Sequence, residues 1–426
     1  MGLGNLWKFP YIAGNSGGGI FLIFYLLFML LLGVPILLAE MAIGRNTGLS
    51  AVGAYQKIDR KWAFVGGIGV LCAFVILSYY SVVGGWVLKY ITAYATGANF
   101  GGNTAAYFDT FVKSPVEPAI WHLVFLAFCA VVVIGGVAKG IEKASKIMLP
   151  GLFILIVVVA VRSALLEGGL QGLKFLFVPD FKAVTSAADV GNIAVQAMGQ
   201  VFFSLSLGLG VTITYGSYLR KETNLQKSAV IISGLDSLMA ILSGIAILPA
   251  VFSFGFTPSA GPGLIFQTLP SVFESMPAGL IFGLLFFILV FFAAATSAIA
   301  LLEAVAAYLI DNFHWKRSTA TVSMALLMGV IGIFASLSMG VLSDASIFGM
   351  NLFDAMGYLS DKILMPLAAF FMCIFVGHIW GVDSISKEIE EGAGAFKTKR
   401  VFGAILRYVA PVVIFIIFIV GLFPPA

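Results

Sequence analysis

Residues 2–11 read GLGNLWKFPY and residues 202–210 read FFSLSLGLG, and these two stretches decide the fold. Each places two glycines one residue apart inside an apolar segment. A pair of interrupted helices in the two halves of a chain is typical of membrane carriers built from an inverted repeat, whose binding site lies where the helices are broken. The alternative is that the glycines only permit close helix packing, which is common in membranes.

The composition excludes a water-soluble fold. Of the 426 residues, 60% are hydrophobic and 10% are charged, whereas soluble domains carry about 25% charged residues. The mean hydropathy is +1.06. The basic residues behind the net charge of +4 lie in short loops between apolar runs. We therefore expect one all-α integral membrane domain over residues 1–426, surrounded by a lipid bilayer and without a nucleic-acid partner.

The apolar runs predict eleven transmembrane helices. They lie at about residues 8–16, 19–43, 63–95, 119–138, 143–165, 190–219, 226–255, 279–312, 317–340, 349–381 and 402–424. Lysine and arginine concentrate in alternate loops, which predicts that these loops and the amino terminus face the cytoplasm. The segments 97–118, 166–189 and 256–278 are then expected outside.

Four stretches closely resemble the neurotransmitter:sodium symporter family, and the resemblance runs from residue 2 to the end of the chain. They are GLGNLWKFPY with the run NSGGGIFLIFYLLFMLLLGVPILLAEMAIGR at 15–45, SYYSVVGGW at 78–86, GQVFFSLSLGLG with TYGSYLRK between 199 and 221, and FFAAATSAIA at 291–300. The resemblance implies a LeuT-like fold with broken first and sixth helices. Its two five-helix inverted repeats would be residues 1–165, with a truncated first helix, and 190–381, followed by an eleventh helix at 402–424. Eleven helices suit the bacterial branch.

This resemblance implies a sodium-coupled secondary active symporter of the inner cell membrane. It would import hydrophobic L-amino acids, branched, aromatic or otherwise apolar, by alternating access. The nearest alternative is a proton-coupled amino-acid carrier of the same fold, with Glu40 or Glu303 as the proton site. We do not expect an enzyme, because the three histidines are far apart in sequence and not clustered with acids.

Two sodium sites follow from the resemblance. The first would consist of Asn5, Ser204 and Asp236 together with the substrate carboxylate. An aspartate within LDSLMAILSG is expensive in a membrane unless it is functional or paired; the alternative is an acid at a helix end that reaches water. The second site would use the Ala293 carbonyl and the hydroxyls of Thr296 and Ser297, although these hydroxyls could instead bond back to the preceding helical turn.

Chloride independence is a further expectation. Relatives that need chloride hold it among a tyrosine, a glutamine and hydroxyl groups, and Tyr25, Gln200 and Ser204 occupy those positions here. Asp236 would supply a fixed negative charge in place of the anion. The expected ions are therefore two sodium ions without a chloride requirement.

The substrate carboxylate would bind backbone N–H groups around Leu3 and Gly4 and the Tyr80 hydroxyl, as anions do at helix starts. Gly2 stands where monoamine carriers of the family have an acid, which favours an amino acid as cargo. The remaining substrate contacts, which form a wall without charged groups, would be Ile76, Phe203, Ser204, Ser206, Leu209, Ala298 and Leu301. For Ile76 and Leu301 a plain core-packing role is the alternative.

Gates are expected on both sides of the site. Outside, Phe203 and Tyr80 would cover the substrate. The family's outer arginine is replaced by Lys8, and Gly357 falls where its aspartate is expected, with Asp354 one turn away, so the sequence leaves an outer ion pair open. Inside, Tyr218 and Asp311 match the family's inner gate. The position of Glu40 is the one that braces the unwound sixth helix in relatives.

Overall fold

The computed structural model describes residues 2–97, 100–181, 186–255, 263–392 and 394–422. Regular structure in these ranges is helical throughout. Nine of the described helices are long and apolar enough to cross a membrane: Gly19–Thr47, Arg60–Ala95, Glu117–Ile134 (α7), Val137–Ala164, Leu225–Ser253 (α12), Gly279–Phe313 (α14), Arg317–Leu337 (α15), Leu352–Glu390 and Lys399–Leu422. Each coincides with one of the eleven predicted spans.

Several of the long helices consist of consecutive pieces with a local change of helical geometry. These pieces are α2 (Gly19–Phe28), η2 (Met29–Gly33), α3 (Val34–Thr47), η3 (Arg60–Trp62), α5 (Ala63–Ala95), η4 (Val137–Glu142), α8 (Lys143–Ala164), α16 (Leu352–Tyr358), η7 (Leu359–Leu364), α17 (Met365–Ile374), η8 (Phe375–Gly381), α18 (Val382–Glu390), α19 (Lys399–Ala404), η9 (Ile405–Val409) and α20 (Ala410–Leu422).

The two predicted spans outside this set are the first and the sixth, which are built from short helices. The first is η1 (Gly4–Lys8) followed by α1 (Phe9–Asn15), and the sixth is α10 (Ala187–Ser204) followed by α11 (Val211–Gly216). The first helix begins before the predicted residue 8, because the Asn5 N–H already donates to the Gly2 carbonyl at 3.1 Å. Asn5 therefore lies in a helical turn.

The sixth helix is interrupted between α10 and α11. Ser206, Gly208 and Gly210 have φ of +54°, +83° and +69°, a region that glycine enters at little cost but other residues rarely adopt. A Cβ atom on Gly208 would lie 2.7 Å from the Met365 carbonyl oxygen, so the close approach of α17 also leaves no room for a larger residue here. The predicted glycine interruption is therefore a real break in the helix.

Short helices occupy the connections. They are α4 (Ala51–Ile58), α6 (Thr104–Lys113), α9 (Gly169–Phe177), η6 (Leu264–Thr268) and α13 (Leu269–Ser275). All but α4 fall in segments predicted to be outer loops, so these loops carry helical structure that the transmembrane prediction did not include. Parts of all three predicted loops, residues 98–99, 182–185 and 256–262, lie outside the described residues.

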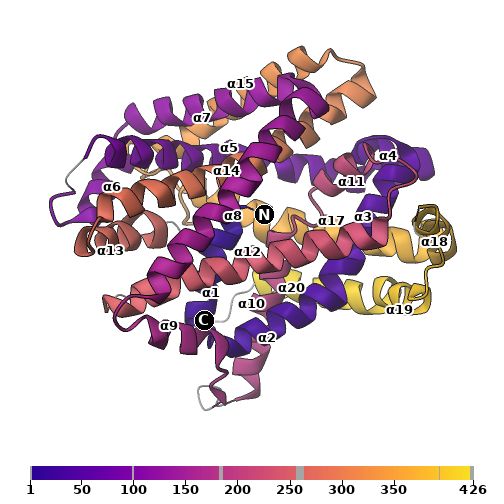
Figure 1. Cartoon of the computed structure of the whole chain (residues 1–426). Coiled ribbons are helices and arrows are strands. Elements are labelled where there is room, and N and C mark those ends of the chain that lie inside the picture. The colour runs from indigo at the N-terminus through magenta and orange to yellow at the C-terminus, as the bar shows by residue number, and fades with distance from the viewer. Residues whose placement is uncertain (1, 98–99, 182–185, 256–262, 393, 423–426) are drawn as a thin grey trace.

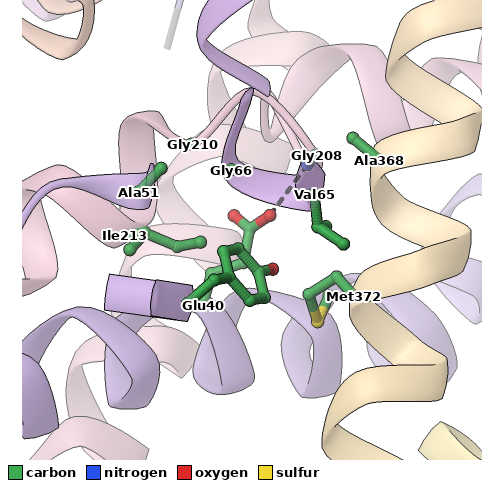
Figure 2. A pocket seen from close by; sticks show the side chains of 10 residues that line it. Glu40, Ala51, Val65, Gly66, Gly208, Gly210, Ile213, Ala368 and Met372 are labelled. Atoms are coloured by element: carbon green, nitrogen blue, oxygen red, sulfur yellow. Dashed lines mark hydrogen bonds between the residues drawn. The ribbon is translucent and has the colours of Figure 1, made fainter. Parts of the chain in front are cut away.

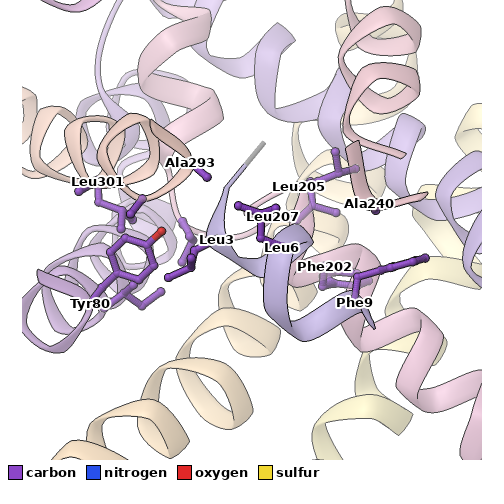
Figure 3. Close-up of a cluster of buried hydrophobic side chains, with 14 of the residues drawn as sticks. Leu3, Leu6, Phe9, Tyr80, Phe202, Leu205, Leu207, Ala240, Ala293 and Leu301 are labelled. Carbon is purple, nitrogen blue, oxygen red and sulfur yellow. The ribbon is translucent and has the colours of Figure 1, made fainter. Parts of the chain in front are cut away.

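The first helix lies at the centre of the assembly. Figure 1 shows α5, α7, α14 and α15 packed side by side, with α8 and α12 crossing beside them and α1 and α10 further along. In Figure 3, Leu3 points toward Tyr80 and Leu301, while Phe9 lies beside Phe202. Because the first helix is enclosed by helices far from it in sequence, its polar groups are positioned inside the membrane domain.

The outer surface of the helix assembly is apolar. Leu30, Val131, Ile154, Leu326 and Phe415 are between 50% and 71% exposed on five different long helices. Such side chains are expected to contact lipid in a multi-pass membrane protein.

Candidate functional site

Three buried polar side chains meet where the first helix passes the broken sixth helix. Asn5 and Asp236 are each 1% exposed, and Ser204 is 9% exposed. The Asn5 Nδ2 donates to Asp236 Oδ1 at 2.8 Å, while the Ser204 hydroxyl lies 2.5 Å from Asn5 Oδ1 and contacts Asp236 Oδ2. Amide, hydroxyl and carboxylate oxygens are the hard ligands that alkali and alkaline-earth cations prefer. The cluster can therefore hold a cation.

Each member of this cluster is placed by a different element. Asn5 comes from η1, Ser204 is the last residue of α10, and Asp236 lies well inside α12. Asp236 is therefore not an acid that reaches water from a helix end, which was the alternative interpretation of the sequence. A further hydrogen bond joins the first and sixth helices, since Gln200 Nε2 donates to the Gly4 carbonyl at 3.3 Å.

The predicted second ion site lies beside Gly2. A Cβ atom built on Gly2 would be 2.2 Å from Ser297 Oγ and 4.0 Å from the Ala293 carbonyl oxygen. The Thr296 hydroxyl donates back to the Phe292 and Ala293 carbonyls, at 2.9 and 3.1 Å. The Thr296 hydroxyl thus bonds back to the preceding helical turn, which was the alternative to a role as an ion ligand. Its lone pairs are still able to accept a cation, since its proton is what the back-bonds use.

A cavity of about 500 Å³ joins these groups. Nearly all predicted substrate contacts line it, namely Gly2, Leu3, Gly4, Ile76, Tyr80, Phe203, Ser204, Ser206, Leu209 and Leu301. The predicted ion ligands Asn5, Asp236, Thr296 and Ser297 also line it. Such a volume is typical of a site for a small organic molecule.

Two predicted residues lie off the cavity wall. Ala298 and Ala293 are fully buried and line no part of it. On α14 the wall is formed instead by Ser297, Ala300 and Leu301, which share one helix face by their spacing of three and four residues. Ala298 follows Ser297 directly and is rotated about 100° from it around the helix, so its contact with the substrate stays a prediction.

The cavity extends beyond the predicted substrate contacts. The additional lining residues are Leu37, Met41, Ser145, Leu149, Leu205, Val211, Thr212, Tyr215, Gly216, Leu219, Ile232 and Met365. Ser145 and Leu149 form one face of α8, and Tyr215 and Leu219 lie on and just after α11. Sequence reasoning missed this portion because apolar helix faces do not reveal which of them border a cavity.

Two glycines are required by close contacts with the site. A Cβ atom on Gly4 would lie 2.4 Å from a ring carbon of Phe203. Together with the contact between Gly2 and Ser297, this shows that the glycines of the opening motif also bring the first helix against α10 and α14. An acid at Gly2 would not fit without displacing Ser297.

An ion pair closes one side of the site. Lys8 Nζ lies 3.3 Å from Asp361 Oδ2 and 3.8 Å from the ring centroid of Phe203. The sequence left this pair open, with Gly357 at the position of the family's aspartate. Asp361 is one turn beyond Gly357 on the same face, and Asp354 pairs with Asn351 at the start of α16. Lysine thus replaces arginine without loss of the pair.

The predicted inner gate is arranged differently. The Tyr218 hydroxyl donates to Glu303 Oε1 at 2.6 Å, and Arg317 forms two bonds to Glu303, at 2.6 and 3.0 Å. Asp311 accepts from the Ser50 N–H at the start of α4 instead of contacting Tyr218. Tyr218 meets Glu303 and not Asp311 because Asp311 lies two turns further along α14. Sequence reasoning missed Arg317 because only the fold brings the start of α15 to Glu303 on α14.

The predicted bracing contact from Glu40 is present. Glu40 Oε1 accepts from the Gly208 N–H at 2.8 Å. The residues at the positions that hold chloride in chloride-dependent relatives are also close together, since the Tyr25 side chain lies near Asp236 and Ser204. The Tyr25 hydroxyl and Gln200 Oε1 are buried without a hydrogen-bond partner among the described residues.

The chain is similar to known proteins along nearly its whole length. The family model described as "Sodium:neurotransmitter symporter family" matches residues 1–100 and 114–425. A sodium-dependent transporter of Bacillus subtilis, YhdH, is 40% identical over 425 residues, covering 98% of this chain and 93% of the relative. A sodium-dependent transporter of Haemophilus influenzae is 34% identical, covering 99% and 94%. The crystal structure of MhsT in complex with L-phenylalanine matches with a TM-score of 0.90 at 38% identity, covering 99% of this chain and 96% of MhsT.

Proposed function

The chain belongs to the sodium:neurotransmitter symporter family, and from this we propose that it imports hydrophobic L-amino acids together with sodium, without chloride. Membership in this family makes the chain a multi-pass membrane protein that carries a small molecule together with sodium. It is a transporter and not an enzyme. The chemical class of the substrate, the ion sites and the orientation in the membrane belong to the proposal.

The observation that carries the proposal is the contact of Asn5, Ser204 and Asp236 on the wall of the cavity. A sodium ion among their oxygens would have the negative charge of Asp236 to balance it. A substrate carboxylate at the Leu3 and Gly4 backbone would complete the coordination from the cavity side. A second sodium would lie between Ala293, Thr296 and Ser297, beside Gly2.

The apolar wall supports a hydrophobic side chain as cargo. Ile76, Phe203, Leu209 and Leu301 border the cavity, and no basic side chain does within the described residues. MhsT, the structural relative, is bound to L-phenylalanine. A charged side chain would lose its hydration on such a wall without gaining a partner.

Coupling follows from the shared ion and carboxylate. If sodium and substrate contact each other, each raises the affinity of the other by the same factor. Each sodium that moves down a membrane potential contributes about 2.3 kcal/mol per 100 mV. Binding of both would favour closure of Phe203 and Tyr80 over the substrate, and movement of the broken helices would then release it inward through the part of the cavity near Tyr215 and Leu219.

Orientation and internal symmetry complete the proposal. The basic loops support an amino terminus in the cytoplasm of the cell, with the Lys8–Asp361 pair toward the outside. Residues 1–165 and 190–381 would form the two inverted repeats, and residues 402–424 the eleventh helix. The two repeats would rock against each other around the site.

Uptake into proteoliposomes tests the function. Labelled leucine, tyrosine and tryptophan are offered with an inward sodium gradient, with potassium in place of sodium, and with gluconate in place of chloride. We expect sodium-dependent accumulation that does not change without chloride and that is lost in Asp236→Ala. Sodium-independent uptake that collapses with a pH gradient would show the proton-coupled alternative, and binding without accumulation would show a receptor.

A further inference from the structure

Glu40 is a buried acid that has no charged partner among the residues that the structure describes. It is 1% exposed on α3, and its Oε1 accepts from the Gly208 N–H of the broken sixth helix. Its Oε2 has no hydrogen-bond partner within the described part of the chain, although the Thr212 side chain lies near. Figure 2 shows the carboxyl group directed toward Gly208 and surrounded by apolar side chains.

The other buried acids differ from Glu40 in this respect. Glu303 is paired with Arg317, Glu388 with Arg45, and Asp236 contacts Asn5 and Ser204. Within the described ranges, the groups that face Glu40 include two titratable side chains, Tyr55 and Cys373, and no basic one. They are Tyr55 from α4, Val65 and Gly66 from α5, Gly208, Gly210, Thr212 and Ile213 from the sixth helix, and Ala368, Met372 and Cys373 from α17. An isolated carboxylate in such surroundings is costly and tends to become neutral.

The carboxyl group borders a small cavity. Its volume is about 10 Å³, and its wall includes Tyr55 and the Gly208 and Gly210 backbone. This is close to the smallest space that holds one water molecule, which also needs two to four polar partners. Glu40, Tyr55 and the glycine backbone can supply these partners.

We propose that Glu40 holds a resident proton on Oε2, and that one ordered water in this cavity links the neutral carboxyl group to the Tyr55 hydroxyl. Oε1 is the acceptor for Gly208, so the proton belongs on Oε2. The broken sixth helix then rests on a neutral acid, and transport stays driven by sodium. Loss of this proton at alkaline pH places an unpaired charge beneath Gly208 and distorts the segment that carries Phe203, Ser204 and Leu209.

Infrared spectroscopy of the purified protein tests the proton directly. A protonated carboxyl C=O band is expected at neutral pH, and it should disappear in Glu40→Gln. The matched control is Glu303→Gln, which should leave the band unchanged because Glu303, unlike Glu40, forms an ion pair with Arg317. Tyr55→Phe should shift the band by removing the partner of the bridging water. If wild-type protein shows no band assignable to Glu40, the proposal is overturned.

The pH profile of sodium-driven uptake gives a second readout. Uptake by the wild type should fall as the pH becomes alkaline, whereas Glu40→Gln should keep its activity and lose this decline. An unchanged decline in the variant, or a folded variant that is inactive at every pH, would overturn the proposal. If the variant does not fold, titration of the infrared band in wild-type protein decides. The infrared measurement needs no substrate, so its result is independent of the proposed transport function.

Discussion

The ammonium group of Lys8 lies 3.3 Å from the carboxylate of Asp361, and this contact joins the first helix to η7 on one side of the cavity. The same ammonium lies over the Phe203 ring. The pair therefore connects closure of the outer side to the side chain that covers the proposed substrate.

Asp361→Asn should weaken outer closure. A partly exposed ion pair contributes about 0.2–1 kcal/mol, which corresponds to a shift of up to about fivefold between closed and open states. Reactivity of a cysteine introduced beside the cavity with a membrane-impermeant reagent should rise accordingly. Asp354→Asn is the matched control, because among the described hydrogen bonds the Asp354 carboxylate accepts only from Nδ2 of the nearby Asn351. Equal reactivity in both variants would contradict a gate at Asp361.

Asp236→Asn should lower sodium affinity. The lost interaction is a hydrogen-bonded charge worth about 1.5–3 kcal/mol, which corresponds to roughly a 10- to 150-fold weaker affinity. Because the fixed negative charge is removed, uptake should also become sensitive to chloride, with Tyr25 and Gln200 as the neighbouring polar groups. Sodium titration with and without chloride measures both effects. A variant with unchanged sodium affinity would exclude Asp236 as a ligand.

Gly4→Ala should impair substrate binding through contact with Phe203. The new Cβ would lie 2.4 Å from the ring, so the ring or the first helix must move. We expect a loss of affinity of at least tenfold in equilibrium binding, which is about 1.4 kcal/mol. Gly67→Ala is the control: a Cβ there meets nothing within 4 Å, and alanine favours the helix. Similar losses in both variants would mean a general effect of the added methyl group.

Glu388→Gln should destabilise the folded protein. Glu388 receives Arg45 Nε at 2.7 Å and Lys221 Nζ at 2.6 Å, and both carboxylate and Arg45 side chain are almost fully buried. Removing one partner of a buried pair costs about 3–5 kcal/mol. Denaturation in detergent, followed by circular dichroism, should show this loss. Glu391→Gln removes only an exposed partner of Lys221 and should change stability by less than about 1 kcal/mol.

Sodium removal should weaken substrate binding, and substrate should strengthen sodium binding by the same factor. Calorimetry of each ligand with and without the other measures the two factors. The equality is required by the thermodynamic cycle; a factor well above one is expected because the proposed carboxylate and sodium meet at the cavity wall around Asn5 and Ser204. Independent binding would show that the carboxylate does not share the sodium coordination.

The sequence by itself determined the membrane class, nine of the spans by length and apolar composition, and the family. It also identified the break in the sixth helix, because two glycines so close together, at 208 and 210, weaken a helix inside an apolar run. Asn5, Ser204 and Asp236 were predicted together only through the family resemblance, since they lie on three different helices.

Only the tertiary structure decided which charges meet. Lys8 pairs with Asp361, and Tyr218 meets Glu303 and Arg317. It also brought Glu40 to the Gly208 N–H, with no cation beside it in the part of the chain that the structure describes. The physical reason is that hydropathy and periodicity report how a single helix divides between apolar and polar faces. The partner of a buried charge depends on helix rotation and crossing, which are fixed by packing between different helices; Lys8 and Asp361, for example, lie 353 residues apart in sequence.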